Sequence, residues 1–595
     1  MENSQLDQIL VASSSSGSSN GLAKGGFRAL PFIIVTDGLE KVVTYGLGAS
    51  MILYLTREYG LENAAGAQVM FIWTAAINFV PVLAAFLADS YVGRYWMIGF
   101  GSIASILGTG LLWLTAVVPG ARPQPCAGDA HSTGSCRMRA TTTRQLMFLY
   151  ASLGLISIGS GSMRSSCMAF GADQMMMVST KRGSSRVLES IFSWYYISTA
   201  IAILLAITVI VYIQDSAGWS AGFGVCVVLM VLSAVSFFSA SVFYVKPVAK
   251  ASLVTELAQV VVAAWTKRSI KLLPPPQSTT LAYHHHHQST AAVMNLEPSE
   301  NLRFLNKACI IQHPEQDLTQ EGKPAHPWRL CSVEQVEDLK SVIRIIPIWS
   351  AGMLMSVTAS QQSIQLLQLA TMDRHITPKI EIPAGSFSIF LVLTLLIWVP
   401  LYDRAILPLA STLRGRPVSL PLKTRLGLGI LLSSASMAAL GLVESIRRAR
   451  ALDEGLSDDP NGIVDMSAMW FLLYYVPFGV AEAFNYIGQN EFYYSELPRS
   501  MASISTTLYQ MGLSVSNLVA SLVLSVVDRA TRGDGGGGSW VGSNINKGHY
   551  DYYYWVLAGL SLGNFVYYVA CCKGYGPLKG EGEDTREEVD EVGNQ

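Results

Sequence analysis

Charged side chains are scarce in this chain: only 14% of its 595 residues are Asp, Glu, Lys or Arg, against about 25% in an ordinary globular protein. The formal net charge of -1 gives no electrostatic signal for nucleic acid, so no nucleic-acid partner is expected. Half of the residues are apolar, and the mean hydropathy is +0.35. These values indicate a protein embedded in a lipid bilayer rather than a soluble domain.

Two features of catalytic proteins are also missing. None of the nine histidines falls within an apolar stretch long enough to span a membrane, although membrane enzymes that use haem, iron or a histidine base generally need one there. No Gly-rich phosphate loop of the GxxxxGK[ST] type occurs, which argues against a pump driven directly by ATP. We therefore expect no enzymatic activity, no cofactor and no metal, which leaves secondary transport as the function class.

Apolar runs of about 20 residues, the length that crosses a bilayer, are frequent. The sequence predicts twelve spans, at residues 30–55, 67–89, 96–118, 145–169, 191–213, 222–245, 341–363, 384–402, 425–446, 467–489, 502–527 and 552–572. A long polar stretch separates the first six from the last six. Two six-helix bundles around one midplane site are the outline of the major facilitator fold, so we expect an all-α membrane protein of this type.

The chain divides accordingly into five segments. They are a disordered N-terminal tail (1–27), an N-terminal bundle (28–245), a long central loop (246–340), a C-terminal bundle (341–573) and an acidic tail (574–595). The first tail is polar and Ser-rich, without the apolar core of a cleavable leader. Lys and Arg are more frequent on the side of the tails and the central loop, which places these segments in the cytoplasm. There they could be substrates of a regulatory kinase.

Cysteine is sparse as well, with eight residues in the whole chain. Cys126 and Cys136 both fall in the predicted outer loop between the third and fourth spans, on the oxidising side where a disulfide can form. Four adjacent histidines, His284 to His287, lie in the central loop. Metal binding and a solvated low-complexity linker are the two interpretations of this run, and we favour the linker.

The first predicted span nevertheless carries three charges. Asp37, Glu40 and Lys41 follow one another at spacings that place them on one helical face, so Asp37 can pair with Lys41 one turn away. A charged side chain near mid-membrane costs roughly 2.5–3.5 kcal/mol on insertion scales, so such residues indicate function by default. A proton-coupling site is the favoured interpretation, and an ion pair that only orients helices is the alternative.

Several sequence blocks, spread over residues 24–572, carry a resemblance to a known family. They read KGGFRALPFII (24–34), LADSYVGRY (87–95), GADQ (171–174), VYIQD (211–215), PWRLCSVEQV (327–336), IPAGS (382–386), VPLYDR (399–404), AEAF (481–484) and GHYDYYYW (548–555). With them the chain resembles the plant nitrate and peptide transporter family, a branch of the proton-dependent oligopeptide transporters within the major facilitator superfamily. The match is to the subgroup whose first-helix motif ends in Lys.

The resemblance implies roles for the charged residues. The family's proton-coupling motif, Glu-x-x-Glu followed by Lys or Arg, matches Asp37, Glu40 and Lys41, with an Asp where the family has Glu. The family's basic residue ahead of GADQ falls on Arg164, which needs an anion such as Asp37 or Glu40 and is otherwise a structural counter-ion. The acidic residue of the tenth span falls on Glu482, a gate or substrate partner in the family, or else a carboxylate turned to inner water.

One departure from the family bears on the substrate. Nitrate-transporting relatives use a His on the seventh span, and the matching position here is predicted to be Thr358, which brings no positive charge. If nitrate binds, Arg164 and Lys41 must replace the imidazolium together with neutral donors, and the affinity should be low. These donors are Thr358, Gln361 and Gln362. A larger substrate would instead be held by aromatic residues, for which the candidates are Tyr45, Trp73, Tyr195, Tyr196, Phe387 and Tyr509.

Together these features predict a proton-coupled symporter that works by alternating access. External protonation of Asp37 and Glu40 should release them from Lys41 and Arg164 and let the loaded site turn inward. Nitrate, bound at low affinity, is the favoured substrate. A plant hormone or other organic acid or glucoside, and a transport-poor nutrient sensor, are the alternatives. The plasma membrane is favoured over the vacuolar membrane as its location.

Charges at the helix ends of the two halves occupy matching loops. Asp89 and Arg94 lie between the second and third spans, and Asp403 and Arg404 lie between the eighth and ninth. We expect these pairs to latch one conformation of the transporter rather than to contact the substrate.

Overall fold

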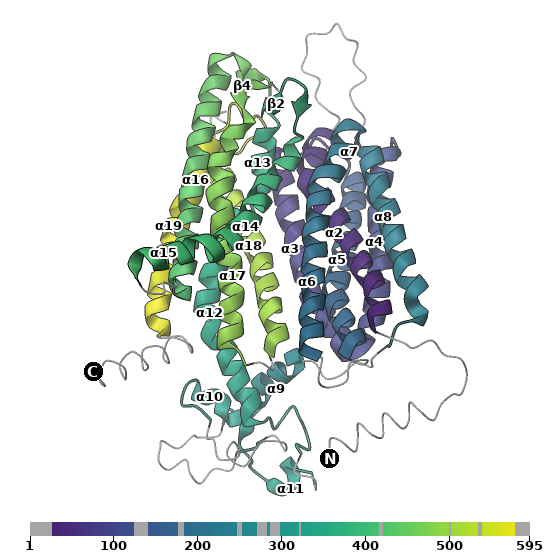
Figure 1. The fold of residues 1–595 in the computed structure, drawn as a ribbon, viewed down its shortest axis with the longest axis vertical. Helices are drawn as coiled ribbons and strands as arrows, with labels where there is room; N and C mark the ends of the chain where they lie inside the picture. The colour runs from purple at the N-terminus through teal and green to yellow at the C-terminus, as the bar shows by residue number, and fades with distance from the viewer. Residues whose placement is uncertain are drawn as a thin grey trace.

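The structure is a computed structural model with helices that run up and down between two ends of the molecule (Figure 1). It describes residues 26–123, 141–176, 184–246, 253–269, 283–285, 298–319, 323–415, 420–460, 462–498, 501–532 and 538–576. One end carries α9 (Leu253–Thr266), α10 (Arg303–Asn306) and α11 (Pro314–Asp317), and we call it the linker end. The opposite end carries the short strands, and we call it the hairpin end.

The elements of the N-terminal half are helical throughout the described residues. They are η1 (Gly26–Arg28), α2 (Leu30–Leu53), η2 (Tyr54–Glu58), α3 (Asn63–Leu87), η3 (Ala88–Val92), α4 (Arg94–Val117), α5 (Thr143–Met176), α6 (Ser184–Leu205), η4 (Ala206–Ile210), α7 (Val211–Ser216), α8 (Trp219–Ser239) and η5 (Ala240–Val242). The η segments are short π or 3-10 turns. Several continue a neighbouring long helix, as η2 continues α2.

The C-terminal half adds four short strands to its helices. Its elements are η7 (Lys307–Cys309), α12 (Val333–Ala359), α13 (Gln362–Leu369), β1 (Met372–Asp373), β2 (His375–Thr377), β3 (Ile380–Glu381), η8 (Ala384–Ser388), α14 (Ile389–Leu401), η9 (Tyr402–Ile406), α15 (Leu407–Arg414), α16 (Leu422–Asp453), η10 (Leu456–Asp458), β4 (Val464–Ser467), η11 (Ala468–Phe471), α17 (Leu472–Glu496), α18 (Ala502–Thr531) and α19 (Tyr550–Tyr575). β1 pairs with β4 in parallel, and β2 pairs with β3 in an antiparallel hairpin.

Ten helical segments of the described chain are long and apolar enough to cross a membrane. They are Asn63–Val92, Arg94–Val117, Thr143–Met175, Trp194–Ser216, Trp219–Val242, Val333–Leu369, Ala384–Arg414, Leu422–Asp453, Ile504–Thr531 and Tyr550–Tyr575. Each coincides with one of the predicted spans, so the multi-pass, all-α membrane architecture is confirmed. The first and tenth predicted spans are the helices α2 and α17, of 24 and 25 residues, which carry charged residues. Their passage through the membrane stays a prediction.

The two halves repeat one packing pattern. α2 packs on α8 as α12 packs on α19, and α4 packs on α5 as α16 packs on α17. The α4–α5 contact depends on glycine, because a Cβ at Gly108 would lie 2.7 Å from the backbone N of Ile156, and one at Gly159 would lie 2.5 Å from that of Ser105. Small residues let membrane helices approach closely where lipid supplies no hydrophobic drive between them.

Part of the central loop folds against the linker end. α9, η7 and the first turns of α12 enclose a small apolar core that includes Val260, Cys309 and Val336. His284 is buried beside it, and its backbone N–H donates to the Cys309 carbonyl at 2.9 Å. The prediction of a solvated linker is therefore wrong for this part of the loop. The expected disulfide, the last two histidines of the run and residues 1–25 of the predicted tail 1–27 lie outside the described residues.

The halves are joined by contacts between mid-membrane and the hairpin end. α3 packs along α18, where the Ser514 hydroxyl donates to the Ala75 carbonyl at 2.9 Å. Nearer the hairpin end, Asn63 Nδ2 donates to the Ser543 carbonyl at 3.0 Å. Mid-way, a Cβ at Gly385 would lie 2.8 Å from the Ala49 carbonyl, so η8 presses directly on α2. The molecule is therefore closed at the hairpin end.

Candidate functional site

Asp37 and Lys41 form a tight buried ion pair on α2. Lys41 Nζ lies 2.7 Å from Asp37 Oδ2 and donates to Thr199 Oγ1 of α6 at 2.7 Å. The ammonium also lies 4.3 Å from the centre of the Tyr195 ring, a distance at which cation and ring attract each other. Lys41 is thus held by three groups, and Tyr195 belongs to this cluster rather than to a substrate pocket.

Glu40, the residue before Lys41 on α2, forms a second and longer ion pair with Arg164 of α5. Arg164 Nε lies 3.6 Å from Glu40 Oε2, beyond the usual range of a hydrogen bond. Glu40 Oε1 accepts a hydrogen bond from Thr44 at 2.7 Å, but Oε2 and Arg164 Nε have no such partner in the described part of the chain. The Arg164 guanidinium rests 5.0 Å from the centre of the Tyr45 ring. Glu40 is fully buried, so this pair depends on charge attraction with incomplete hydrogen bonding.

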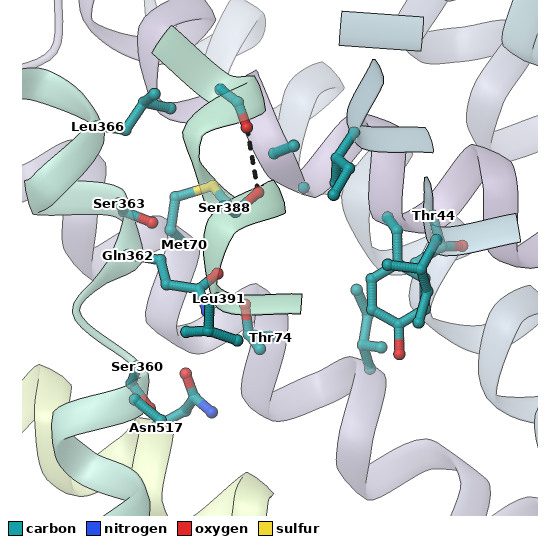
Figure 2. Close-up of a pocket in the computed structure, with 18 of the residues that line it drawn as sticks. Thr44, Met70, Thr74, Ser360, Gln362, Ser363, Leu366, Ser388, Leu391 and Asn517 are labelled. Atoms are coloured by element: carbon teal, nitrogen blue, oxygen red, sulfur yellow. Dashed lines mark hydrogen bonds between the residues drawn. The ribbon is translucent and has the colours of Figure 1, made fainter. Parts of the chain in front are cut away.

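A cavity of about 410 Å³ lies between the two halves (Figure 2). Tyr45, Trp73 and Arg164 line it, as the sequence predicts, and Arg164 is the single charged side chain among the described lining residues. Trp73 is buried, and its Nε1 has no hydrogen-bond partner among described residues. The cavity therefore offers one cation, one spare indole donor and an aromatic wall.

Neutral polar groups make up most of the remaining polar lining. Those from the N-terminal half are Thr44, Thr74 and Asn78, and those from the C-terminal half are Ser356, Ser360, Gln362, Ser363, Ser388 and Asn517. In Figure 2, Ser360, Gln362, Ser363 and Asn517 lie on one side of the pocket and Thr44 lies on the other. Such donors orient a ligand without adding charge.

The structure does not place Thr358 and Gln361 on the cavity wall. The Thr358 hydroxyl bonds to Ser433 of α16 at 2.7 Å, and Gln361 accepts from the Tyr553 hydroxyl of α19 at 2.9 Å. Both side chains therefore point into the C-terminal bundle, where they bond to neighbouring helices. Successive residues of a helix point in different directions, so the residue next to Thr358 can face the cavity. The neighbour Ala359 lines the cavity instead. On α12 the described cavity lining is therefore Ser356 and Ala359, a hydroxyl and a methyl group.

Glu482 also lies outside the cavity lining. It sits on α17, and its Oε1 is buried without a hydrogen-bond partner among the described residues. Tyr509 of α18 is close enough to interact with it electrostatically. Its role as a gate or substrate partner stays a prediction.

The helix-end charges behave differently in the two halves. Arg94 bonds both Asp89, at 3.0 Å, and Asp173 of α5, at 2.8 Å. The structure places no ion pair between Asp403 and Arg404, which are both exposed. The residue of the C-terminal half that corresponds to Arg94 lies near the start of α16.

Arg425 near the start of α16 donates to both carboxylate oxygens of Glu491 on α17, each at 2.6 Å. α16 and α17 repeat the packing of α4 and α5, so this pair matches Arg94 with Asp173. The sequence analysis missed it because the two residues are 66 positions apart. Both pairs join helices of one half. The expected role of the helix-end charges as latches of one conformation stays a prediction.

Residues around the charged cluster were also missed. Thr44 lies one helical turn after Glu40, a spacing from which a bond between them could have been predicted. Thr199 and Asn517 follow no local pattern, because their partners in the site come from other helices.

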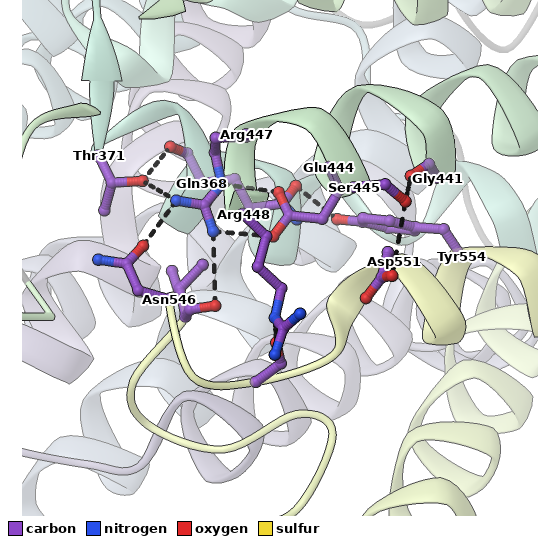
Figure 3. A network of polar contacts seen from close by, with 12 residues as sticks. Gln368, Thr371, Gly441, Glu444, Ser445, Arg447, Arg448, Asn546, Asp551 and Tyr554 are labelled. Carbon is purple, nitrogen blue, oxygen red and sulfur yellow. Dashed lines mark hydrogen bonds and ion pairs between the residues drawn. The ribbon is translucent and has the colours of Figure 1, made fainter. Parts of the chain in front are cut away.

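A further buried acid–arginine pair lies at the hairpin end of the C-terminal half (Figure 3). Arg447 donates through Nε and Nη2 to the two carboxylate oxygens of Glu444, at 2.7 and 2.8 Å. Its Nη1 donates to Asn546 Oδ1 at 2.8 Å and to Thr371 Oγ1 at 3.3 Å. Both charged side chains are fully buried, and no lining residue of the central cavity takes part.

Comparison with known proteins agrees with this architecture. Protein NRT1/ PTR FAMILY 1.2 and Protein NRT1/ PTR FAMILY 1.1 of Arabidopsis thaliana are each 48% identical to the chain, over 558 and 556 residues. The matches cover 93% of this chain and 90% and 92% of the two relatives.

A solved structure described as an auto inhibited POT family peptide transporter superposes with a TM-score of 0.64 at 17% identity. The superposition covers 92% of this chain and 98% of the other, which confirms the expected major facilitator fold. A family model described as the POT family matches residues 95–541. The chain therefore belongs to the POT family of transporters, alongside its plant NRT1/PTR relatives.

Proposed function

We propose that the protein is a proton-coupled symporter that carries an anion by alternating access, with nitrate at low affinity as the first substrate. The observation that carries this proposal is the position of Arg164. Its Nε lies 3.6 Å from the buried Glu40 carboxylate, and the same side chain lines the central cavity. One guanidinium can therefore serve either the proton-binding acid or a bound anion.

The charge balance of the cluster supports this coupling. Asp37 and Glu40 are matched by Lys41 and Arg164, so the cluster is formally neutral. A proton on Glu40 leaves Arg164 without a counter-charge, and one monovalent anion in the cavity restores the balance. Keeping the loaded site neutral avoids the cost of an unpaired charge in the membrane.

Glu40 is a better proton acceptor than Asp37 for a geometric reason. Asp37 bonds directly to Lys41 at 2.7 Å, and Lys41 is fixed further by Thr199. The Glu40 pair is longer by 0.9 Å and leaves Oε2 without a hydrogen bond from any described residue. Removing the charge of Glu40 therefore breaks a contact of 3.6 Å, whereas removing that of Asp37 breaks a bond of 2.7 Å.

The closed hairpin end supplies one state of the transport cycle. Contacts such as Asn63 with Ser543 and Ser514 with Ala75 hold the halves together there. In the opposite state these contacts must break as one half rocks against the other. With the hairpin end outside, as the Lys and Arg distribution predicts, the structure corresponds to the outward-closed state.

The size of the cavity favours a second substrate class, a small organic acid. Its volume of about 410 Å³ falls within the roughly 300–1,000 Å³ typical of pockets for small organic ligands. Trp73 and Tyr45 offer aromatic surface beside Arg164. A solved POT family transporter, similar with a TM-score of 0.59 at 14% identity, was crystallised with 5-aminolevulinic acid. A carboxylate could occupy the place that we assign to nitrate.

Uptake by proteoliposomes or oocytes that contain the full chain tests both substrates. Labelled nitrate and a panel of organic acids are compared at acid and neutral external pH. We expect nitrate uptake to rise with acidity and to vanish when a protonophore removes the gradient. Entry of an organic acid without nitrate would select the second substrate class. Absence of uptake for every compound would overturn the proposal and favour a nutrient sensor.

Ala359→His tests the assignment of the cavity wall on α12. A protonated imidazole there adds a charge-assisted hydrogen bond, worth about 1.5–3 kcal/mol, so nitrate affinity at acid pH should rise by about tenfold or more. Thr358→His is the matched control, because it breaks the bond to Ser433 and faces the helix interface. Higher affinity in Thr358→His but not in Ala359→His would contradict the assignment.

We assign the transporter to the plasma membrane, with the vacuolar membrane as the alternative. A fluorescent fusion of the full chain in plant cells distinguishes the two. Regulation by a kinase stays a prediction, since residues 1–25 and 577–595 lie outside the described chain.

A further inference from the structure

A second cavity, of about 770 Å³, lies at the hairpin end and shares no lining residue with the central one. We call it the vestibule. It is lined by Leu53, Thr56, Arg57, Gly60, Leu61, Glu62, Asn63, Leu367, Ala370, Thr371, Arg374, Pro460, Ile463, Ser543 and Ile545. The residues up to Asn63 come from the N-terminal half and the others from the C-terminal half. The vestibule therefore lies across the seam between the halves.

Two arginines from opposite halves face this space. Arg57 belongs to η2, and Arg374 lies between β1 and β2. They are close enough for their charges to repel each other. Arg374 is paired with Glu381, whereas no described residue forms a hydrogen bond or ion pair with Arg57, and Asp215 of α7 acts on it only through the electrostatic field.

The acid in the lining does not offset Arg57. Glu62 is already paired with Arg532 at 2.8 Å, on the side of α18. The charged side chains among the described lining residues are Arg57, Arg374 and Glu62, so the lining itself carries one net positive charge. Like charges brought together by closure oppose that closure unless an anion lies between them.

The vestibule has fixed walls on the C-terminal side. Arg447, from the buried network of Figure 3, donates to Thr371 Oγ1 at 3.3 Å and to the Ile545 carbonyl at 3.4 Å. Both of these residues line the vestibule. The network therefore holds in place the turn that precedes Arg374.

We propose that the vestibule binds a small oxyanion, of the nitrate or carboxylate class, between Arg57 and Arg374, and that this anion holds the transporter closed at the hairpin end. The planar guanidinium fork matches the paired oxygens of such anions. Because the two arginines belong to different halves, they separate when that end opens. An anion that binds both prefers the closed state and shifts the equilibrium toward it.

This site is distinct from the transport site. It uses neither Arg164 nor the Glu40 cluster, and it does not require that the anion cross the membrane. With the hairpin end outside, the vestibule would sense the external anion concentration. A high concentration would then slow reopening of the empty carrier to the outside.

Hydrogen–deuterium exchange of the full chain in lipid nanodiscs tests the proposal. Exchange of residues 54–63 and 543–545 is followed across a sodium nitrate titration. We expect nitrate to slow exchange in the wild type by about fivefold or more, the lower end of couplings between linked sites. The double variant Arg57→Gln with Arg374→Gln should lose this response.

Two control variants separate the vestibule from other effects. Arg450→Gln removes an exposed arginine of the same end, which donates to the Asp465 carbonyl and does not line the vestibule. Arg164→Gln removes the cation of the central cavity. Both should keep the nitrate response. A response that persists in the Arg57 and Arg374 double variant would overturn the proposal. A response lost in Arg164→Gln would also overturn it, by assigning the effect to the transport site.

Arg57→Glu provides an independent test, because it places a carboxylate permanently beside Arg374. We expect slow exchange at the hairpin end without nitrate and a reduced rate of uptake. Arg57 is exposed, so the substitution should not impair folding. Exchange in Arg57→Glu as rapid as in Arg57→Gln, both without nitrate, would contradict the proposed bridge.

Discussion

Two buried pairs of glutamate and arginine occur in the described part of this molecule, and they differ in how completely they are bonded. In the C-terminal half, Arg447 makes two short bonds to Glu444 and further bonds to Thr371 and Asn546. In the N-terminal half, Glu40 lies 3.6 Å from Arg164, and an atom on each side lacks a hydrogen bond to any described residue. Sequence composition alone would treat the pairs alike.

The difference separates a structural pair from one that can change partners. Glu444 and Arg447 lie three residues apart on one helix, and their remaining donors and acceptors are used within the same half. Glu40 and Arg164 come from different helices, and Arg164 also borders a cavity. A buried ion pair that is well bonded on all sides is costly to open, whereas an incompletely bonded pair beside a cavity is prepared to exchange one anion for another.

Glu40→Gln should produce the largest effect. The amide keeps the shape of the carboxylate and the bond from Thr44 but neither binds a proton nor pairs with Arg164. We expect proton-driven uptake to fall to background, as measured in proteoliposomes with an imposed pH gradient. Counterflow exchange of substrate without a gradient should survive if the variant folds. Undiminished gradient-driven uptake would show that Glu40 is not the coupling acid.

Glu444→Ala should affect stability rather than coupling. It leaves the Arg447 guanidinium buried without its counter-ion, a change that costs about 3–5 kcal/mol in comparable buried pairs. The melting temperature of the purified protein in detergent should fall, while the molecules that remain folded keep the pH dependence of uptake. The double variant Glu444→Leu with Arg447→Met should recover part of the stability. Lost coupling at normal stability would remove the distinction between the two pairs.

The fold could be predicted from the sequence because its signals are local. Apolar runs of membrane length and the polar stretch between the halves gave the spans, and ten of them are confirmed. α2 and α17 were equally visible as predicted spans, but their charged residues make the composition less clear. The folded part of the central loop was missed because its core unites α9 and η7 with α12, segments that show no common pattern in the sequence.

The site could be predicted where neighbours in sequence are neighbours in space. The pair of Asp37 with Lys41 follows from helical spacing. The orientation of α12 about its axis could not be predicted in this way, because a shift of one residue exchanges the buried Thr358 for the cavity-lining Ala359. Partners contributed by distant helices, such as Thr199 and Asn517, depend on tertiary packing that no local pattern contains.

The helix-end pairs Arg94 with Asp173 and Arg425 with Glu491 should give the smallest effect, because both are partly exposed. Partly exposed ion pairs contribute about 0–1 kcal/mol. Arg94→Gln should lower the melting temperature more than Arg425→Gln, since Arg94 bonds two acids and the Ala169 carbonyl, whereas Arg425 bonds one acid. The measurement is thermal unfolding in detergent at low and high salt. High salt should reduce both effects, because it screens the charges.

Since each pair joins helices of one half, neither variant should alter hydrogen–deuterium exchange at the hairpin end. A large change there would mean that these pairs latch the halves, and that partial exposure does not make an ion pair weak in this fold.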